Sequence, residues 1–252
     1  MPARGFGRAS GFGTAAAEAA IAGATALVST VPPDGDGDPV LRAHGAAIRA
    51  AKALRWVGYC STTGVYGNRD GGWVDEATPP APGQPRSQRR LEAEQAWRAA
   101  LPPGAGLDLM RIAGIYGPGR SALEDVAAGS ARRVDRPGHA FGRIHVEDIA
   151  GTVLAALARP PAPGDVRVLN LADDEPAPQA DVVAEAARLL GVEPPPLVPF
   201  EQALSRMGEM GRSFWAENRR VANTATKAAL GRPLAYPTYR EGLAAILAQQ
   251  GR

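Results

Sequence analysis

Residues 57–67 read VGYCSTTGVYG, an apolar segment followed by three hydroxyl side chains and a turn of small residues. The apolar part carries the aromatic and β-branched side chains that are typical of a buried strand. Ser61, Thr62 and Thr63 stand where that strand ends. Hydroxyls at such a place either close the strand with local hydrogen bonds or line an active site, and the residues alone leave both interpretations open.

The pattern around this segment alternates strands with helices. Further strands are predicted at 26–30, 107–112 and 166–172, and helices at 14–23, 41–54, 87–100, 146–157 and 178–190. This alternation indicates an α/β fold with a parallel sheet covered by helices on both faces. In the helix at 146–157, apolar side chains repeat at helical spacing and predict one buried face: Val146, Ile149, Ala150, Val153, Leu154 and Leu157.

Ligands in parallel α/β folds bind at the carboxyl ends of the strands. Three predicted strand ends carry small or polar residues: Thr30 with Val31, Ser61 to Thr63, and Gly114 to Gly117. We therefore expect one shared crevice there.

Composition limits the class of protein. The 252-residue chain has a formal net charge of +2, which gives no reason to expect nucleic acid as a partner. No apolar run approaches the roughly 18 residues of a membrane span. A single cysteine, Cys60, excludes an intrachain disulfide and fits a reducing compartment, so the sequence predicts a cytoplasmic protein without a membrane segment. Cys60 and the three histidines lack metal-ligand spacing, and no metal site is predicted.

Five strings follow one another along most of the chain: STTGVYG, RIAGIYGPGR, RIHVEDIA, NLADDEP and YPTYREGL. Together they resemble the extended short-chain dehydrogenase/reductase family, the NAD-dependent epimerase/dehydratase group. The resemblance runs from about residue 24 to 247. It implies a Rossmann-type core at 14–172, a small helical C-terminal portion at 173–252 that contacts substrate, and NAD or NADP as cofactor, after a mobile start at 1–13.

The resemblance also implies a function. It predicts an NAD(P)-dependent oxidoreductase or epimerase/dehydratase-like protein that acts on a nucleotide-sugar-like or other small polar substrate. The competing hypothesis is a non-catalytic relative, nucleotide-sensing or structural, that has kept the scaffold. Because the family often dimerises through paired helices, a homodimer is an open expectation.

Site residues follow from the same resemblance. In the family, a hydroxyl three residues before the Val of Val-Tyr-Gly binds the reacting oxygen, and Thr62 holds that position here. Tyr66 is its titratable neighbour and the second catalytic candidate. Cofactor contacts are expected from Thr30, Val31, Ser61, Arg90, Gly114, Ile115, Tyr116 and Gly117, and substrate contacts from Thr63, Arg86, Arg120 and His145.

The sequence departs from the family at its proton donor. The family uses a Tyr with a Lys four residues later, and none of the five tyrosines here has that lysine. Aligning 86–95 with the family helix puts Arg86 at the Tyr position and Arg90 at the Lys position. Arg90 can still hold a ribose or phosphate as a fixed cation. Arg86 cannot donate a proton, because its pKa lies above about 12. Tyr66 and His145 remain, and for each a structural role is the alternative.

A second departure concerns the cofactor's phosphates. A dinucleotide-binding fold needs a Gly-rich turn between its first strand and first helix. GFGTAA at 11–16 spells G-x-G-x-x-A, but no strand pattern precedes it, so an accident of composition is favoured. The first strands are therefore expected to be missing, which leaves 26–30 as an uncovered sheet edge. A longer native product, a remnant of the fold, and a partner that covers the edge are the three alternatives.

Overall fold

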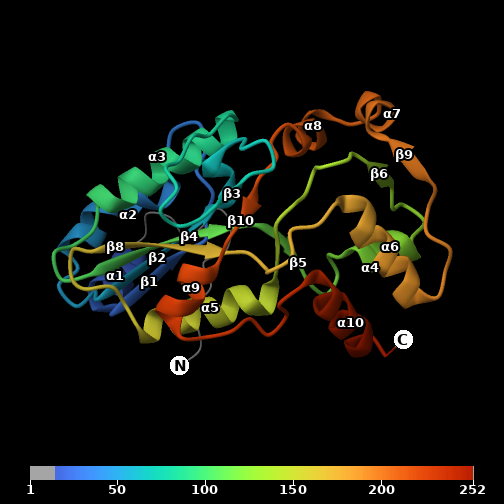
Figure 1. Cartoon of the computed structure of the whole chain (residues 1–252). Coiled ribbons are helices and arrows are strands. Elements are labelled where there is room, and N and C mark those ends of the chain that lie inside the picture. The colour runs from blue at the N-terminus through green and yellow to red at the C-terminus, as the bar shows by residue number, and fades with distance from the viewer. Residues whose placement is uncertain (1–14, 252) are drawn as a thin grey trace.

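The computed structural model describes residues 15–251. Its main sheet has four parallel strands, β1 (Ala26–Ser29), β2 (Trp56–Thr62), β4 (Gly106–Ile112) and β8 (Val166–Leu171). Their order across the sheet is β1-β2-β4-β8. The predicted α/β class and parallel sheet are confirmed (Figure 1).

Side chains alternate along β2 and so supply both faces of the sheet. Val57 and Tyr59 pack into a cluster with α2 and α3, whereas Trp56 and Cys60 pack into a second cluster with α5 and α9. Figure 1 shows α2 and α3 on one side of the sheet and α5 and α9 on the other. These helices are α2 (Pro39–Ala50), α3 (Pro85–Ala99), α5 (Val146–Ala158) and α9 (Thr224–Leu230), and α1 (Ala15–Gly23) lies against α2.

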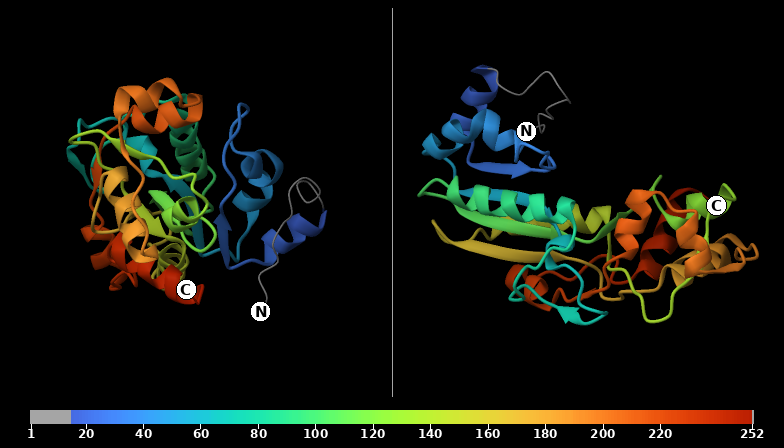
Figure 2. Two further views of the ribbon diagram at one scale, coloured as in Figure 1. Left: turned by 90° about the vertical axis from the view of Figure 1, so that its right-hand side faces the viewer. Right: turned by 90° about the horizontal axis from the view of Figure 1, so that it is seen from above.

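β1 forms one edge of this sheet. Within residues 15–251 it pairs with β2 alone, and Val28 in its middle is 42% exposed. Figure 2 shows β1 at one side of the molecule with α1 and α2. The expectation of an open edge at this strand is confirmed for the described residues.

The buried face predicted for α5 is partly wrong. Val146, Leu154 and Leu157 are 44%, 66% and 40% exposed. The buried side chains of the helix are Asp148, Thr152 and Ala156, and Ile149 and Val153 are partly buried against the cluster that includes β2 and β8. Helical spacing identified the helix, but its orientation depends on what packs against it.

The second half of the molecule lies beyond the carboxyl ends of the sheet (Figure 1). It holds three two-stranded parallel pairs: β5 (Gly114–Tyr116) with β7 (Arg143–His145), β6 (Arg133–Asp135) with β9 (Leu197–Pro199), and β3 (Trp73–Val74) with β10 (Arg220–Val221). Its helices are the 3-10 turn η1 (Thr63–Tyr66), α4 (Ala122–Ala127), α6 (Gln179–Leu190), α7 (Phe200–Ser205), α8 (Glu209–Trp215) and α10 (Tyr239–Gln249).

A hydrophobic cluster holds α4, α6 and α10 together. It joins Leu123, Val182 and Leu243, which come from both sides of residue 172, while α9 returns to pack on β8. Residues on both sides of position 172 therefore share this hydrophobic cluster. The domain boundary at 172 stays a prediction. Two of the helices begin with a capping box, α4 with Ser121 and Glu124 and α10 with Thr238 and Glu241. Within 15–251 no helix has the length and apolarity needed to cross a membrane.

Candidate functional site

A cavity of about 390 Å³ opens at the carboxyl ends of β2 and β4. Thr62, Thr63 and Gly64 form its floor where β2 passes into η1, and Gly114 to Tyr116 of β5 form the adjoining wall. Helix α3 contributes its first turn and α8 contributes its last, so the two halves of the molecule meet around this space. Its volume is within the range of about 300–1,000 Å³ typical of ligand pockets.

The three consecutive hydroxyls divide between structure and cavity. Ser61 is buried and donates to the Glu94 carboxylate across 2.5 Å, so it fastens β2 to α3. Thr62 and Thr63 line the cavity. The Thr62 Oγ1 accepts a hydrogen bond from the Gly64 amide at 3.1 Å, which leaves its own hydrogen available to a ligand.

Tyr66 lies in a buried polar network away from the cavity. Arg111 donates to both oxygens of Glu94 at 3.1 and 2.8 Å, and its guanidinium lies 4.7 Å from the centre of the Tyr66 ring. Tyr66 is 0% exposed and its hydroxyl donates to Asn170 at 2.7 Å. Burial raises the pKa of Tyr66. The structure thus places Tyr66 in the core, where it cannot reach a molecule in the cavity.

The two arginines that replace the family's Tyr and Lys have different positions. Arg86 is exposed, lines the cavity, and stacks over the Phe214 ring at 4.7 Å. Arg90 does not line it. It donates through Nη1 to the Cys60 carbonyl, and its guanidinium lies 5.8 Å from the centre of the Tyr59 ring.

Tyr116 is the one tyrosine of the described chain that lines the cavity. Burial raises its pKa, and its hydroxyl donates to the Thr238 carbonyl at 3.4 Å. A Cβ on Gly242 would lie 2.0 Å from that hydroxyl, so the glycine makes room for the ring. This confinement suits a positioning role better than proton donation.

The structure does not bring the other sequence-predicted residues to the cavity. Thr30 is exposed and Val31 half-buried after β1, and Arg120 is exposed in a turn with Gly117. His145 is 0% exposed, its Nδ1 accepts from the Glu147 amide at 3.3 Å, and burial lowers its pKa.

Several cavity residues carried no signal in the sequence. Phe141 and Arg143 come from β7 and the segment before it, and Trp215, Glu217 and Arg219 come from α8 and the turn after it. Arg219 pairs with Glu217 at 2.7 Å. These residues are separated by some 70 positions in the chain and follow no strand of the main sheet, so no spacing rule could have grouped them.

Asp173 is a buried acid close to this wall. Its side chain is 1% exposed, neither carboxylate oxygen has a hydrogen-bond partner, and the carboxylate forms no ion pair. Burial raises its pKa to about 8, although the Arg143 charge opposes the shift. Within residues 15–251 no group of three or more His, Cys, Asp or Glu is placed to hold a metal ion.

The described residues fit one end of a dinucleotide better than the other. Thr62 and the small residues Ala113 and Gly114 leave room for a flat ring at the strand ends. The turn after β1, by contrast, carries Asp34, Asp36 and Asp38, and Asp38 caps α2 by accepting from the Val40 and Leu41 amides. A phosphate would meet carboxylates there. GFGTAA lies largely outside the described residues. Residues 15–251 therefore offer no Gly-rich phosphate turn.

Comparison with models of known protein families gives no match. Among curated proteins, the chain is 34% identical to Protein YeeZ of Escherichia coli K12 over 181 residues, which is 70% of this chain and 63% of YeeZ. It is 32% identical to the 3-diazoavenalumate denitrifying reductase of a Streptomyces species, over 68% of this chain and 58% of that protein. The chain thus spans less than two thirds of the length of these relatives.

Among solved structures, a conserved protein of unknown function from Silicibacter pomeroyi DSS is 49% identical, with a TM-score of 0.82, over 90% of this chain and 78% of that one. A protein from Methylobacillus flagellatus assigned as an NAD-dependent epimerase/dehydratase is 27% identical, with a TM-score of 0.60, over 85% and 71%. The chain belongs to the extended short-chain dehydrogenase/reductase family.

Fold similarity extends further within this family. The human epimerase family protein SDR39U1, whose structure contains NADPH, has a TM-score of 0.71 at 18% identity, over 89% of this chain and 82% of that one. At this identity the match concerns the fold alone. The resemblance inferred from the five sequence strings is thereby confirmed at the level of family and fold.

Proposed function

We propose that this short-chain dehydrogenase/reductase relative is an NAD(P)-dependent oxidoreductase or epimerase/dehydratase-like enzyme that acts on a small substrate in the 390 Å³ cavity. One observation carries the proposal. The Thr62 hydroxyl lies on the cavity floor and its oxygen accepts from the Gly64 amide, so its hydrogen is available for donation to a ligand.

The cofactor, when bound, supplies or accepts a hydride. Thr62 then orients and polarises the reacting group, and Gly114 and Ile115 bound the space for a flat ring. The Arg90 guanidinium, which donates to the Cys60 carbonyl through one nitrogen, is the cationic group proposed for the cofactor ribose. NAD and NADPH occur in structures of similar fold, which supports this choice of cofactor.

The decisive experiment is a fluorescence titration of the purified 252-residue chain with NADH and with NADPH. Saturable binding at micromolar concentration is the expected result, and Arg90→Ala should weaken it. Equal affinity in Arg90→Ala would remove Arg90 from the site, whereas no binding by a folded chain would overturn the cofactor proposal.

A non-catalytic relative is the second candidate, because two features favour it. Arg86 stands at the cavity where the family has its tyrosine, and the described residues lack a Gly-rich phosphate turn. This candidate predicts that the chain has no measurable turnover, so that Thr62→Val changes only thermal stability or, in a nucleotide-sensing relative, ligand affinity. A turnover that is lost in Thr62→Val would exclude it.

A further inference from the structure

Arg143 occupies a wall shared by two cavities. It is the first residue of β7, and with Tyr116 and Gln179 it lines both the 390 Å³ cavity and a neighbouring one of about 180 Å³. Nη1 donates to the Phe141 carbonyl at 2.9 Å and to the Ala177 carbonyl at 3.0 Å. These bonds fix the guanidinium through one nitrogen, and Nε and Nη2 bond to no other described residue.

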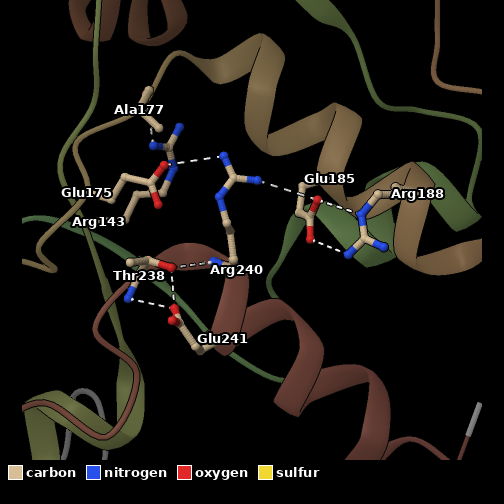
Figure 3. Close-up of polar contacts among 8 residues, drawn as sticks. All are labelled: Arg143, Glu175, Ala177, Glu185, Arg188, Thr238, Arg240 and Glu241. Atoms are coloured by element: carbon tan, nitrogen blue, oxygen red, sulfur yellow. Dashed lines mark hydrogen bonds and ion pairs between the residues drawn. The ribbon is translucent and has the colours of Figure 1, made fainter.

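The neighbouring arginines show what Arg143 lacks. Arg240 contacts Glu175 at 3.3 Å and Glu185 at 3.6 Å, and Arg188 contacts Glu185 at 2.7 Å. In Figure 3 these carboxylates join Arg240 and Arg188, whereas the contact drawn from Arg143 runs to Ala177, a backbone carbonyl. Arg143 forms no ion pair with any carboxylate in residues 15–251.

An enclosed cation without an ion pair is unfavourable. Arginine cannot relieve this by losing its proton, since its pKa stays above about 12 in proteins. The charge of the buried Asp173 favours the Arg143 cation, but it forms no salt bridge or hydrogen bond with the guanidinium. Of the other cavity arginines, Arg219 is neutralised by Glu217 and Arg86 is solvated. The missing negative charge is therefore expected from the ligand.

Aromatic side chains line the same cavity beside Arg143, whose guanidinium lies 5.9 Å from the centre of the Phe141 ring. Phe141 and Trp215 meet edge to face with ring centres 4.9 Å apart, and Phe214 is 51% exposed at the rim. Exposed aromatic surface beside a cavity favours binding of a flat apolar group. Since about 390 Å³ is near the lower end of ligand-pocket volumes, a substrate that shares it with a cofactor ring must be small.

We propose that the substrate is a small molecule with a flat ring and an anionic group, a carboxylate or phosphate, which Arg143 binds while Phe141, Phe214 and Trp215 pack on the ring. This inference rests on the proposed function for the identity of the cavity as the substrate site. It names Arg143 as the residue that selects substrates by charge.

The test measures binding of three probes by calorimetry without cofactor: cinnamate, its neutral amide cinnamamide, and uridine monophosphate. Wild type should bind at least one of the two anions roughly tenfold or more tightly than cinnamamide, because a charged hydrogen bond contributes about 1.5–3 kcal/mol. Arg143→Gln should remove that preference. Arg240→Gln is the matched control, since this arginine already has two carboxylate partners, and it should keep the preference.

The outcomes separate the two proposals. Preference for cinnamate assigns the anion to a carboxylate, and preference for the nucleotide assigns it to a phosphate. Equal affinity for cinnamate and cinnamamide together with no binding of the nucleotide would overturn the inference, as would an unchanged preference in Arg143→Gln. If Arg143→Gln fails to fold, Arg143→Lys and the wild-type comparison decide the question. Arg143→Gln should bind NADH as tightly as wild type does. A wild type that fails to bind NADH would therefore contradict the proposed function and would leave the role of Arg143 to the three probes.

Discussion

Two polar regions of this molecule each hold an arginine, which is paired with a carboxylate in one region and with no carboxylate in the other. Between β2, β4 and α3, Arg111 is 4% exposed and both Glu94 oxygens accept from it, while Glu94 also accepts from Ser61. In the cavity wall, Arg143 bonds two backbone carbonyls and no carboxylate. A complete network of this kind holds the fold, whereas the incomplete one is the place where we propose that a ligand binds.

The same contrast applies to the carboxylates. Glu94 is 2% exposed with every oxygen partnered, and Asp173 is 1% exposed with neither oxygen partnered. Burial depth is therefore equal in the two regions, and only the number of partners differs. Four substitutions can break or sharpen this comparison.

The largest effect is expected from Glu94→Gln, which leaves the Arg111 charge buried without a carboxylate. We expect the free energy of unfolding to fall by about 3–5 kcal/mol in urea denaturation. Arg42→Gln is the control, because its ion pair with Asp34 lies in solvent and should hardly matter. Equal midpoints for the two variants would show that the Arg111 network does not hold the sheet to α3.

Asp173→Asn tests the incomplete region through pH. The folded-state pKa of Asp173 is raised from 3.8 to about 8, so between these values the folded chain holds a proton that the unfolded chain has lost. This carboxyl therefore makes the free energy of unfolding fall as pH rises from about 4 to 8. Urea unfolding at pH 5, 6.5 and 8 should show a flatter profile for Asp173→Asn. Parallel profiles would contradict a raised pKa at this position.

Tyr66→Phe separates a structural tyrosine from a catalytic one. Removing the hydroxyl leaves the Asn170 Oδ1 without its donor, which should lower the free energy of unfolding by about 1–3 kcal/mol. NADH and cinnamate binding should stay at wild-type strength, because Tyr66 does not line the cavity. Tyr236→Phe, whose hydroxyl contacts Glu147 in solvent, is the stability control. Weakened ligand binding in Tyr66→Phe would show that Tyr66 contributes to the binding site.

The smallest effect is expected from Phe214→Ala at the cavity rim. Because the ring is 51% exposed, stability should barely change. Affinity for a ringed anion should fall a few-fold, since a ring contact and the stacking with Arg86 at 4.7 Å are lost together. Met210→Ala on the same helix is the matched control, being 68% exposed and outside the cavity. If both variants bind the probes equally, the Phe214 ring takes no part in the site.

Local pattern was a good guide to the sheet and a poor guide to the cavity. The alternation along β2 predicted a buried strand because successive side chains point to opposite faces whatever packs on them. It also placed Thr62 and Thr63 at a strand end, where the structure has them on the cavity floor. Ser61, one position earlier, points to α3 for the same geometric reason.

Local pattern could not predict which face of a helix is buried or which residues surround a charged side chain. The apolar residues of α5 predicted a buried stripe, yet Leu154 is 66% exposed, because burial depends on which elements arrive to cover a helix. Nothing in the sequence distinguishes the environment of Arg120 from that of Arg143. In the structure Arg120 is exposed in a turn, whereas Arg143 lines two cavities.

The sequence by itself determined the fold class, the family and the floor of the cavity, since strand ends and family strings are local features of consecutive residues. Only the tertiary structure decided which charged side chains have partners, because Arg143, Asp173 and Trp215 come together from three distant segments. Whether a buried charge is paired depends on distances between residues far apart in the sequence, and the packing of the folded chain sets those distances.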